Sequence, residues 1–466
     1  MNGGRLLYWL KDFWSEFRKV KSGLVGLAFL LLFLLSVVLE PLLIPFPETN
    51  KRWSDITYWD ENPRSAPPFW TNWFTGKKSA VTERIRSFKA EERQSDGVTL
   101  RNLTFPYEDS FEYPPYDLIV HFSGKGSVPF LVALQRPDGE ALELIRAQAD
   151  LTEGEDFHVS VDKEARDAVM EYVRSKESEE AMSRLNRSAL VPTEMIFAEA
   201  GPGMAAKPIA LKGNYRVIVT LMILPDAEVK DPFLVVSGRV SGILGTDSSK
   251  RDIWSGIVAG VKWALLIGLL TAFVSVSVGV VYGIMSAYLG GWKDSLMQRI
   301  FELFISVPLL PILIVMSAVF KPSIWTIIVM MCAFFWVRPV KTVRSMALQI
   351  KEETYIEASR ALGAGSGRII FRHMVPLLIP YAFAVMALDV PSAVVYEATV
   401  SLIGLGDATI VTWGQILRGA LTGGAVLGGL WWWVVPPGIM IALMGMTFAF
   451  VGFAMDKILH PKLRTR

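Results

Sequence analysis

Cysteine is almost missing from this chain of 466 residues, which carries only Cys332. A single cysteine excludes an internal disulfide framework and any metal site built from several thiolates. Histidine is scarce as well, and the four histidines lie too far apart in the sequence for a metal-ligand motif: His121, His158, His373 and His460. An excess of one charge is also missing, because 47 Lys and Arg nearly balance 45 Asp and Glu. The net charge therefore gives no indication of a nucleic-acid partner, and none is expected.

Apolar residues, by contrast, are abundant. Hydrophobic side chains make up 52% of the chain and charged ones only 20%, which is too apolar for a soluble enzyme. A helix needs about 20 apolar residues to cross roughly 30 Å of hydrocarbon. Uncharged runs of this length predict an all-α polytopic membrane protein with six transmembrane helices, at about 22–44, 259–289, 298–320, 323–345, 375–398 and 431–455. The alternation that a membrane barrel requires is absent from these runs.

Basic residues in the short connections predict the orientation. They gather in residues 1–21, between the fourth and fifth spans and in the C-terminal tail, so both termini are expected in the cytoplasm. Residues 1–21 have apolar residues at helical spacing and are expected to form an amphipathic helix on the cytoplasmic surface. The last uncharged run, 419–455, is longer than one span, so 419–430 is expected at the outer surface as a loop or an interfacial helix.

Residues 45–240 have a different composition, with many charges and no run of membrane length. This segment is expected to form an extracellular β-rich domain, a small sandwich, inserted between the first and second spans. Strand-like stretches lie at 118–122, 128–135, 141–145 and 215–224, and Pro137-Asp138-Gly139 is typical of a hairpin turn. Residues 162–190 show helical spacing instead. The sequons at Asn102 and Asn186 are weak signals that suit an exposed domain.

The cytoplasmic stretch after the fourth span carries a short pattern of small residues. Residues 355–362 can form a helix, Gly363 can end it in a left-handed turn, and Pro376 opens the next span. Small side chains on such a helix let another protein approach closely. From physical chemistry alone, an ordinary basic loop remains the alternative.

This stretch resembles the EAA motif of ABC importer permeases. Four residues fall in register with that motif, namely Glu357, Ala358, Gly363 and Pro376. Three positions depart from it: Ser359 replaces the second Ala, His373 the Ile and Val375 the Leu. In that family the segment is a coupling helix that seats in a groove of a separate ATPase subunit.

Further motifs narrow the resemblance to the DppC/OppC-like half of the peptide/nickel permease group. The signature before the second span is matched by Gly245, Thr246, Asp247, Arg251 and Asp252, with Lys250 where the group has Gly. A second signature of the group is resembled by Glu397-Ala398, Ser401, Gly404, Gly406 and Trp413-Gly414. Three shorter patterns also resemble those of the group: Arg299 with Glu302, Trp336 with Arg344, and the tail from Asp456 to Pro461. The resemblance covers most of 1–44 and 240–466, and the insert is the main departure.

The resemblance implies a type I (MetI-like) importer core over 241–466, with the coupling helix near 354–367. Its ATPase-coupling residues would be Tyr355, Glu357, Ala358, Ser359, Leu362, Gly363 and Pro376. The implied partners are a homologous second permease subunit in a heterodimer, two cytoplasmic ABC ATPases, an extracellular solute-binding protein and membrane lipid. ATP and Mg²⁺ would bind the ATPases, and this chain would hold no cofactor or metal and catalyse no reaction. In agreement, no P-loop is present, since Thr75-Gly76-Lys77-Lys78 lacks the required spacing.

Charged residues inside spans are candidates for the solute pathway or its gate, because a bare charge there costs about 2.5–3.5 kcal/mol or more. The charged candidates are Glu302, Asp389 and Glu397, and the uncharged Ser401 is a further candidate for the pathway or gate. An ion pair with Arg299 is an equal alternative for Glu302. Asp389 lies two residues before Pro391, which can unwind the helix there, and the resemblance assigns Glu397 to gate structure.

Three classes of function remain open from the sequence. The leading one is a permease subunit in the cell membrane that imports oligopeptides or dipeptides, with oligosaccharides or nickel as alternative solutes of the same machinery. The second is an ion-coupled secondary transporter with Asp389 and Glu302 as a relay, which the missing inverted repeat disfavours. The third is a membrane-anchored receptor whose working part is the 45–240 domain.

Overall fold

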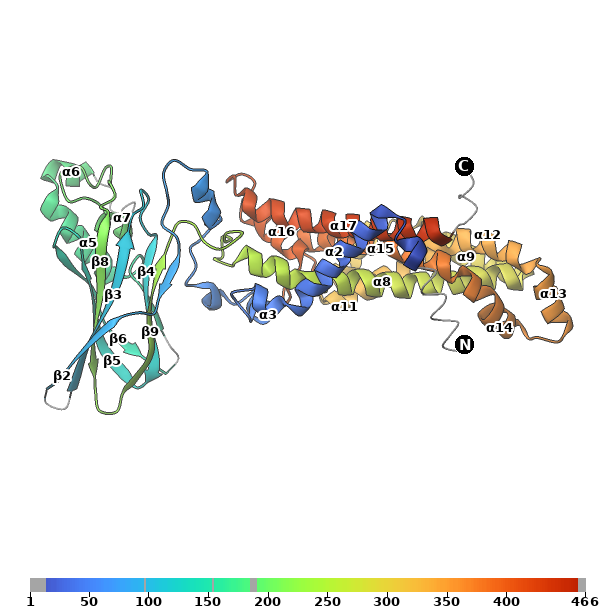
Figure 1. Cartoon of the computed structure of the whole chain (residues 1–466), viewed down its shortest axis with the longest axis horizontal. Coiled ribbons are helices and arrows are strands. Elements are labelled where there is room, and N and C mark those ends of the chain that lie inside the picture. Colours follow the sequence, from blue (N-terminus) through green and yellow to red (C-terminus); the bar gives the residue numbers. More distant parts are fainter. Residues whose placement is uncertain (1–13, 96–97, 153–154, 185–190, 460–466) are drawn as a thin grey trace. The chain divides into compact units, whose positions relative to one another are not determined.

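The computed structural model describes residues 14–95, 98–152, 155–184 and 191–459. Most of the predicted N-terminal helix, the sequon at Asn186 and the tail residue Pro461 lie outside these ranges. The chain divides into two compact units, which we call the helical unit (Met1–Ser54 with Ser255–Arg466) and the sandwich unit (Asp55–Trp254). Figure 1 shows the helices of one and the strands of the other.

Apolar sequence and helix coincide throughout the helical unit. Its elements are α2 (Lys21–Val38), α3 (Glu40–Leu43), α4 (Thr49–Arg52), α8 (Ile253–Leu289), α9 (Gly291–Ser306), α10 (Leu309–Val319), α11 (Ile324–Phe335), α12 (Val337–Lys351), α13 (Thr354–Ala361), α14 (Ser366–Arg368), the π-helical turn η4 (Ile369–Met374), α15 (Val375–Leu402), α16 (Trp413–Thr422) and α17 (Trp431–Leu459). Within the described residues, five helical stretches are long and apolar enough to cross a membrane.

The third predicted span is not one continuous helix. A sixth crossing exists only if α9 and α10 count together, and their axes differ by 79°. The break falls at Val307 and Pro308, where Val307 is extended. Proline lacks the amide proton that would continue the ladder, and it disfavours helical backbone in the residue before it. The helix expected at about 298–320 is therefore two helices, which can still count as one crossing.

Close packing in the helical unit depends on glycine. A Cβ on Gly279 of α8 would lie 2.2 Å from the carbonyl oxygen of Trp336, and one on Gly283 would lie 2.9 Å from that of Val340. Gly23 and Gly26 similarly bring α2 against α17. Small residues at such positions let helix backbones approach closely in an apolar solvent, where packing rather than the hydrophobic effect holds helices together.

The sandwich unit contains two antiparallel sheets. Their strands are β1 (Glu83–Ile85), β2 (Lys89–Ser95), β3 (Val98–Asp109), β4 (Asp117–Lys125), β5 (Ser127–Gln135), β6 (Ala141–Asp150), β7 (Glu155–His158), β8 (Gly213–Ile223) and β9 (Glu228–Ser237). One sheet has the order β1-β9-β4-β7 and the other β2-β3-β8-β5-β6. In the first, Glu83 of β1 pairs with Val236 of β9. Side chains of both sheets, such as Phe122 and Phe130, form one buried core, so the unit is a sandwich as expected.

Strands with clean apolar alternation were predictable, and others were not. All four expected strands are present as β4, β5, β6 and β8, and the expected turn has Gly139 at φ +90°. The long strands β3 and β9 were missed because charges and prolines, Pro106 and Pro232, interrupt them. Helices α5 (Lys163–Lys176) and α6 (Glu179–Arg184) fill the expected helical region, and Asp162 caps α5 by accepting from the Ala165 amide at 2.9 Å. The short α7 (Pro192–Ile196) follows.

Candidate functional site

The predicted short helix on the loop after α12 is present as α13. Its Ile356 is fully buried and belongs to a cluster that includes Val343 of α12, Ile369 and Ile370 of η4 and residues of α8. The neighbouring side chains face outward. Among the residues expected to couple to an ATPase, Tyr355, Glu357 and Ala358 are exposed. One apolar anchor therefore fixes the helix to the bundle and leaves the rest of its surface free for a partner.

Glycine ends α13 in the manner that its sequence predicts. The Gly363 amide donates to the Arg360 carbonyl and the Ala364 amide to the Ser359 carbonyl, both at 3.0 Å, and Gly363 has φ +81°. This pair of bonds with a left-handed residue is the Schellman motif. Leu362, just before the turn, is 88% exposed, and the half-buried Ser359 donates from its hydroxyl to the Tyr355 carbonyl at 2.7 Å. The turn thus presents an apolar side chain to solvent.

The segment that follows returns the chain to the bundle. Ile369, Ile370 and Met374 of η4 are buried, and His373 is half-buried beside them. Pro376 lies in the first turn of α15, directly after the π-helical turn η4. Pro376 is exposed. The seven expected coupling residues therefore share one stretch with a largely accessible surface.

The signature before the second span forms a buried corner of the sandwich unit. The Thr246 hydroxyl donates to the Pro63 carbonyl at 2.6 Å and accepts from the Ala66 amide at 2.9 Å. Asp247 accepts from the backbone amide and the Nε of Arg251, at 2.9 and 2.6 Å. Gly245 has φ +74°, and Thr246 bridges to the buried Asp252. These five residues hold the chain together, and nothing in this corner suggests solute chemistry.

Lys250 stands where the family signature has Gly, and the geometry at this position explains why either Gly or Lys can occupy it. It lies at φ +64°, a backbone conformation that favours glycine. Its ammonium donates to Asp60 Oδ1 at 2.5 Å and to the Asp60 carbonyl at 2.9 Å. The strain of the left-handed backbone is thus compensated by an ion pair that glycine could not make.

Asp60 also joins a histidine that the sequence did not single out for a role. His158 Nε2 lies 2.9 Å from Asp60 Oδ2, and Nδ1 lies 2.8 Å from Asp117 Oδ2. Burial alone would lower the pKa of His158, but the hydrogen bond and charge of Asp117 and the charge of Asp60 together raise it. The pKa of Asp60 is lowered, since Lys250 and His158 outweigh the opposing effect of burial. His158 therefore links the start of β4 and the end of β7 to the signature loop.

In the helical unit, Asp389 of α15 has a partner that sequence reading missed. Its Oδ1 accepts from Arg338 of α12 at 2.9 Å, and the guanidinium lies 3.8 Å from the ring centre of Phe335. Asp389 is 6% exposed, and its Oδ2 has no hydrogen-bond partner among the described residues. The signal was available, because an acidic residue in a span needs a cation and Arg338 is the first charge after an apolar run.

Glu397 belongs to a second buried polar cluster. Its Oε1 accepts from Ser401 at 2.6 Å and from Thr412 at 2.8 Å, and Thr412 caps the start of α16. A Cβ on Gly406 or Gly414 would clash with Ser401, at 2.0 and 2.7 Å. The spacing of this motif is thus explained by packing between α15 and α16. Glu302 is not part of this cluster: it is exposed on α9 and forms the ion pair with Arg299, at 2.8 Å.

Comparison with known proteins agrees with these motifs. Residues 279–465 match the family of binding-protein-dependent transport system inner membrane components, and residues 8–68 match the N-terminal TM domain of oligopeptide transport permease C. The dipeptide transport system permease protein DppC of Bacillus subtilis is 34% identical over 221 residues, 47% of this chain and 68% of DppC. The oligopeptide transport system permease protein OppC of the same organism is 34% identical over 222 residues, 47% of this chain and 72% of OppC. This chain belongs to the binding-protein-dependent transport permeases.

As a permease of this family, the chain is a multi-pass membrane protein, and its insert stands apart from the family pattern. The two family matches leave residues 69–278 uncovered, which includes every strand of the sandwich unit. A solved chain of the MetNI methionine ABC transporter, in inward facing conformations, is 20% identical and covers 45% of this chain and 97% of its own. Its TM-score of 0.34 is too low to support an argument.

The permease offers no metal site in the part that the structure describes. No three His, Cys, Asp or Glu side chains there are grouped closely enough to hold an ion. The polar clusters around Asp389 and Glu397 instead contain one acidic residue each. Asp389 pairs with a guanidinium through Oδ1, and Glu397 accepts from two hydroxyl groups.

Proposed function

We propose that this permease forms half of the membrane pathway of an ATP-driven importer for dipeptides or oligopeptides. The relatives DppC and OppC are named for those solutes, and they support peptides over oligosaccharides or nickel. The absence of a three-ligand metal group in the described residues gives nickel no further support. An extracellular solute-binding protein would deliver the peptide.

The proposed assembly contains a homologous second permease and two cytoplasmic ABC ATPases that bind ATP and Mg²⁺. Six crossings, with α9 and α10 counted as one, leave both termini in the cytoplasm and the sandwich unit outside. The single observation that carries the proposal is α13, a short exposed helix anchored by one buried isoleucine. A helix of this kind can receive a push from an ATPase and transmit it to the bundle.

The path of that push follows the contacts of Ile356. Its cluster contains Val343 of α12 and Met374 next to α15, the helix that carries Asp389. When ATPases close on ATP, movement of α13 would therefore reach the helix with the buried ion pair directly. An ion-coupled transporter with Asp389 and Glu302 as a relay has less support, because each carboxylate pairs with its own arginine.

The test substitutes a small exposed residue of α13. We expect Ala358→Arg to leave the permease inserted and assembled but to reduce peptide-stimulated ATP hydrolysis and uptake in proteoliposomes at least about tenfold, because bulk there blocks the ATPase groove. Ala141→Arg, the same change at an exposed position of the sandwich unit, is the matched control. Uptake by Ala358→Arg equal to that of the control would remove α13 from its coupling role.

A further inference from the structure

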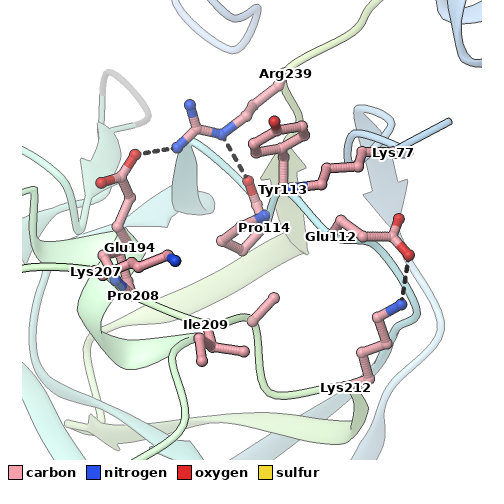
Figure 2. A pocket seen from close by; sticks show the side chains of 11 residues that line it. Lys77, Glu112, Tyr113, Pro114, Glu194, Lys207, Pro208, Ile209, Lys212 and Arg239 are labelled. Carbon is pink, nitrogen blue, oxygen red and sulfur yellow. Dashed lines mark hydrogen bonds and ion pairs between the residues drawn. The ribbon is translucent and has the colours of Figure 1, made fainter. Parts of the chain in front are cut away.

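The sandwich unit contains a surface pocket that the family pattern does not cover. Its volume is about 420 Å³, and it is lined by loops rather than by one sheet face. The lining residues are Lys77, Glu112, Tyr113, Pro114, Glu194, Lys207, Pro208, Ile209, Ala210, Lys212 and Arg239. Figure 2 shows the charged side chains around an apolar floor that contains Ile209. Pockets of this size suit small ligands.

Backbone hydrogen bonds fix the loops that form the pocket. The Tyr113 amide donates to the Lys78 carbonyl at 3.1 Å, and the Ala80 amide donates to the Tyr113 carbonyl at 2.9 Å. On the other side, the Glu199 amide donates to the Ile209 carbonyl at 2.7 Å. The pocket is thus built on paired backbone, and a ligand would not have to order these loops on binding.

Both carboxylates of the pocket are already engaged. Glu112 accepts from Lys212 Nζ at 2.7 Å and from the Lys78 amide at 2.9 Å, and these bonds lower its pKa to about 2. Glu194 pairs with Arg239, which also donates to the Pro114 carbonyl at 3.1 Å. In Figure 2 these pairs lie along the wall. Neither glutamate is left to attract a cationic ligand.

Two lysines of the lining remain uncommitted. Within the described part of the chain, Lys77 and Lys207 are exposed and have neither an ion pair nor a hydrogen bond from their ammonium groups. They lie on opposite sides of the pocket in Figure 2. Large apolar surfaces lie between them, with Tyr113 45% and Ile209 59% exposed. An anionic group with an apolar neighbour would satisfy both features.

We propose that this pocket binds the C-terminal end of a short peptide, with the terminal carboxylate between Lys77 and Lys207 and the last side chain against Tyr113 and Ile209. Ammonium–carboxylate hydrogen bonds are charge-assisted and stronger than neutral ones. A protein surface that presents a single Asp or Glu would fill little of the volume, whereas a few peptide residues would. The pocket belongs to the sandwich unit alone, and the proposal does not depend on the importer assignment.

The test is calorimetric titration of the full-length permease in nanodiscs with N-acetyl-Leu-Leu and with N-acetyl-Leu-Leu-amide. We expect the acid to bind at least roughly tenfold more tightly than the amide, and its affinity to fall as salt is raised. Equal affinity for acid and amide, or no binding of the acid up to about 10 mM, would overturn the proposal.

Substitutions at the two lysines test whether the peptide carboxylate binds in this pocket. The double substitution Lys77→Gln with Lys207→Gln should abolish the preference for the acid. Lys125→Gln, at an exposed lysine that ends β4 outside the pocket lining, should leave it unchanged. Circular dichroism checks that both variants fold. If the double variant binds acid as the unchanged permease does, the carboxylate lies elsewhere. If it instead loses affinity only for the solute-binding protein, the pocket is a protein contact and the proposal fails.

Discussion

At the scale of single residues, Asp109 shows what burial of a carboxylate does in the sandwich unit. It ends β3 with 1% of its surface exposed, and its Oδ1 accepts from the Phe111 amide at 3.1 Å. Its Oδ2 has no partner among the described residues. Burial is the main cause that raises the pKa of Asp109 from 3.8 to about 6. The folded unit therefore holds this proton over a range of pH in which the unfolded chain has released it.

From this we predict that Asp109→Asn stabilises the sandwich unit near neutral pH. A raised folded pKa stabilises the fold at low pH, and that stability is lost as pH rises from about 4 to about 6. Asn keeps the acceptor for Phe111 and carries no charge, so the gain at pH 7 should be on the order of 1–2 kcal/mol and should vanish near pH 4. Thermal unfolding of the purified permease at both pH values measures it. An unchanged pH dependence in the variant would contradict the assignment.

His158 contributes with the same dependence on pH as Asp109, but through the charged form of its side chain. Its folded pKa is raised by Asp117 and Asp60, so the protonated ring stabilises the fold below its unfolded pKa of about 6.5, and this is lost as pH rises through the folded value. We predict that His158→Gln destabilises the sandwich unit by on the order of 2 kcal/mol at pH 6, and by clearly less at pH 8.5. The same loss at both pH values would mean that the charge of His158 is not involved.

At the scale of helices, the contact between α8 and α12 depends on the absence of a side chain. A Cβ on Gly279 would also lie 2.6 Å from Pro339 Cγ, in addition to the Trp336 carbonyl. Both neighbours are stiff, so the two helices would have to separate. The helix α12 in this contact also contains Arg338, the partner of Asp389.

We therefore predict that Gly279→Ala lowers the thermal stability of the detergent-solubilised permease, at a cost of about 1–3 kcal/mol for overpacking. Gly438→Ala inside α17 is the matched control, because its Cβ would meet open space and alanine favours helix. The measurement is the temperature at which the monodisperse peak disappears in size-exclusion chromatography. If Gly279→Ala and Gly438→Ala behave alike, the close contact does not limit stability.

At the scale of the whole molecule, the two ends of the insert lie next to each other in space. The Phe69 amide donates to the Gly242 carbonyl at 3.1 Å, and the permease C match ends at residue 68. Residues 60–66 remain necessary, because Thr246 and Lys250 bond to them. A deletion should therefore begin after Thr71 and end before Ser241.

We predict that a short Gly/Ser linker in place of residues 72–240 preserves insertion and basal ATP hydrolysis while weakening stimulation by the loaded solute-binding protein. In the proposed topology, a domain of this size on the outer side would be placed to contact that protein or the partner permease. Titrating the binding protein against ATPase rate in proteoliposomes gives the apparent affinity. An unchanged affinity in the deletion variant would make the sandwich unit a spacer.

The structural features that could be predicted from the sequence are those that a local pattern of residues determines. Uncharged runs located the apolar helices, Ile356 and Gly363 fall within a helix and turn expected from spacing, and β5 was visible from its alternation. Pairings across long separations were not visible. His158 meets Asp60 98 residues away, and Arg338 meets Asp389 51 residues away. Pro308 is a signal for the break between α9 and α10, but the apolar run continues on both sides of it and hides the break from hydropathy alone.

The pairing of β1 with β9 has a consequence for biosynthesis. Because Glu83 pairs with Val236, β1 has no neighbour in the four-stranded sheet until β9, 153 residues farther along the chain, has been made. At about 5–20 residues per second, this takes roughly 8–30 s. In the proposed topology the nascent segment must cross the membrane unfolded during that time, with the apolar faces of β4 and β5 unprotected. Production of this permease should therefore depend more on export chaperones than production of its relatives without the insert.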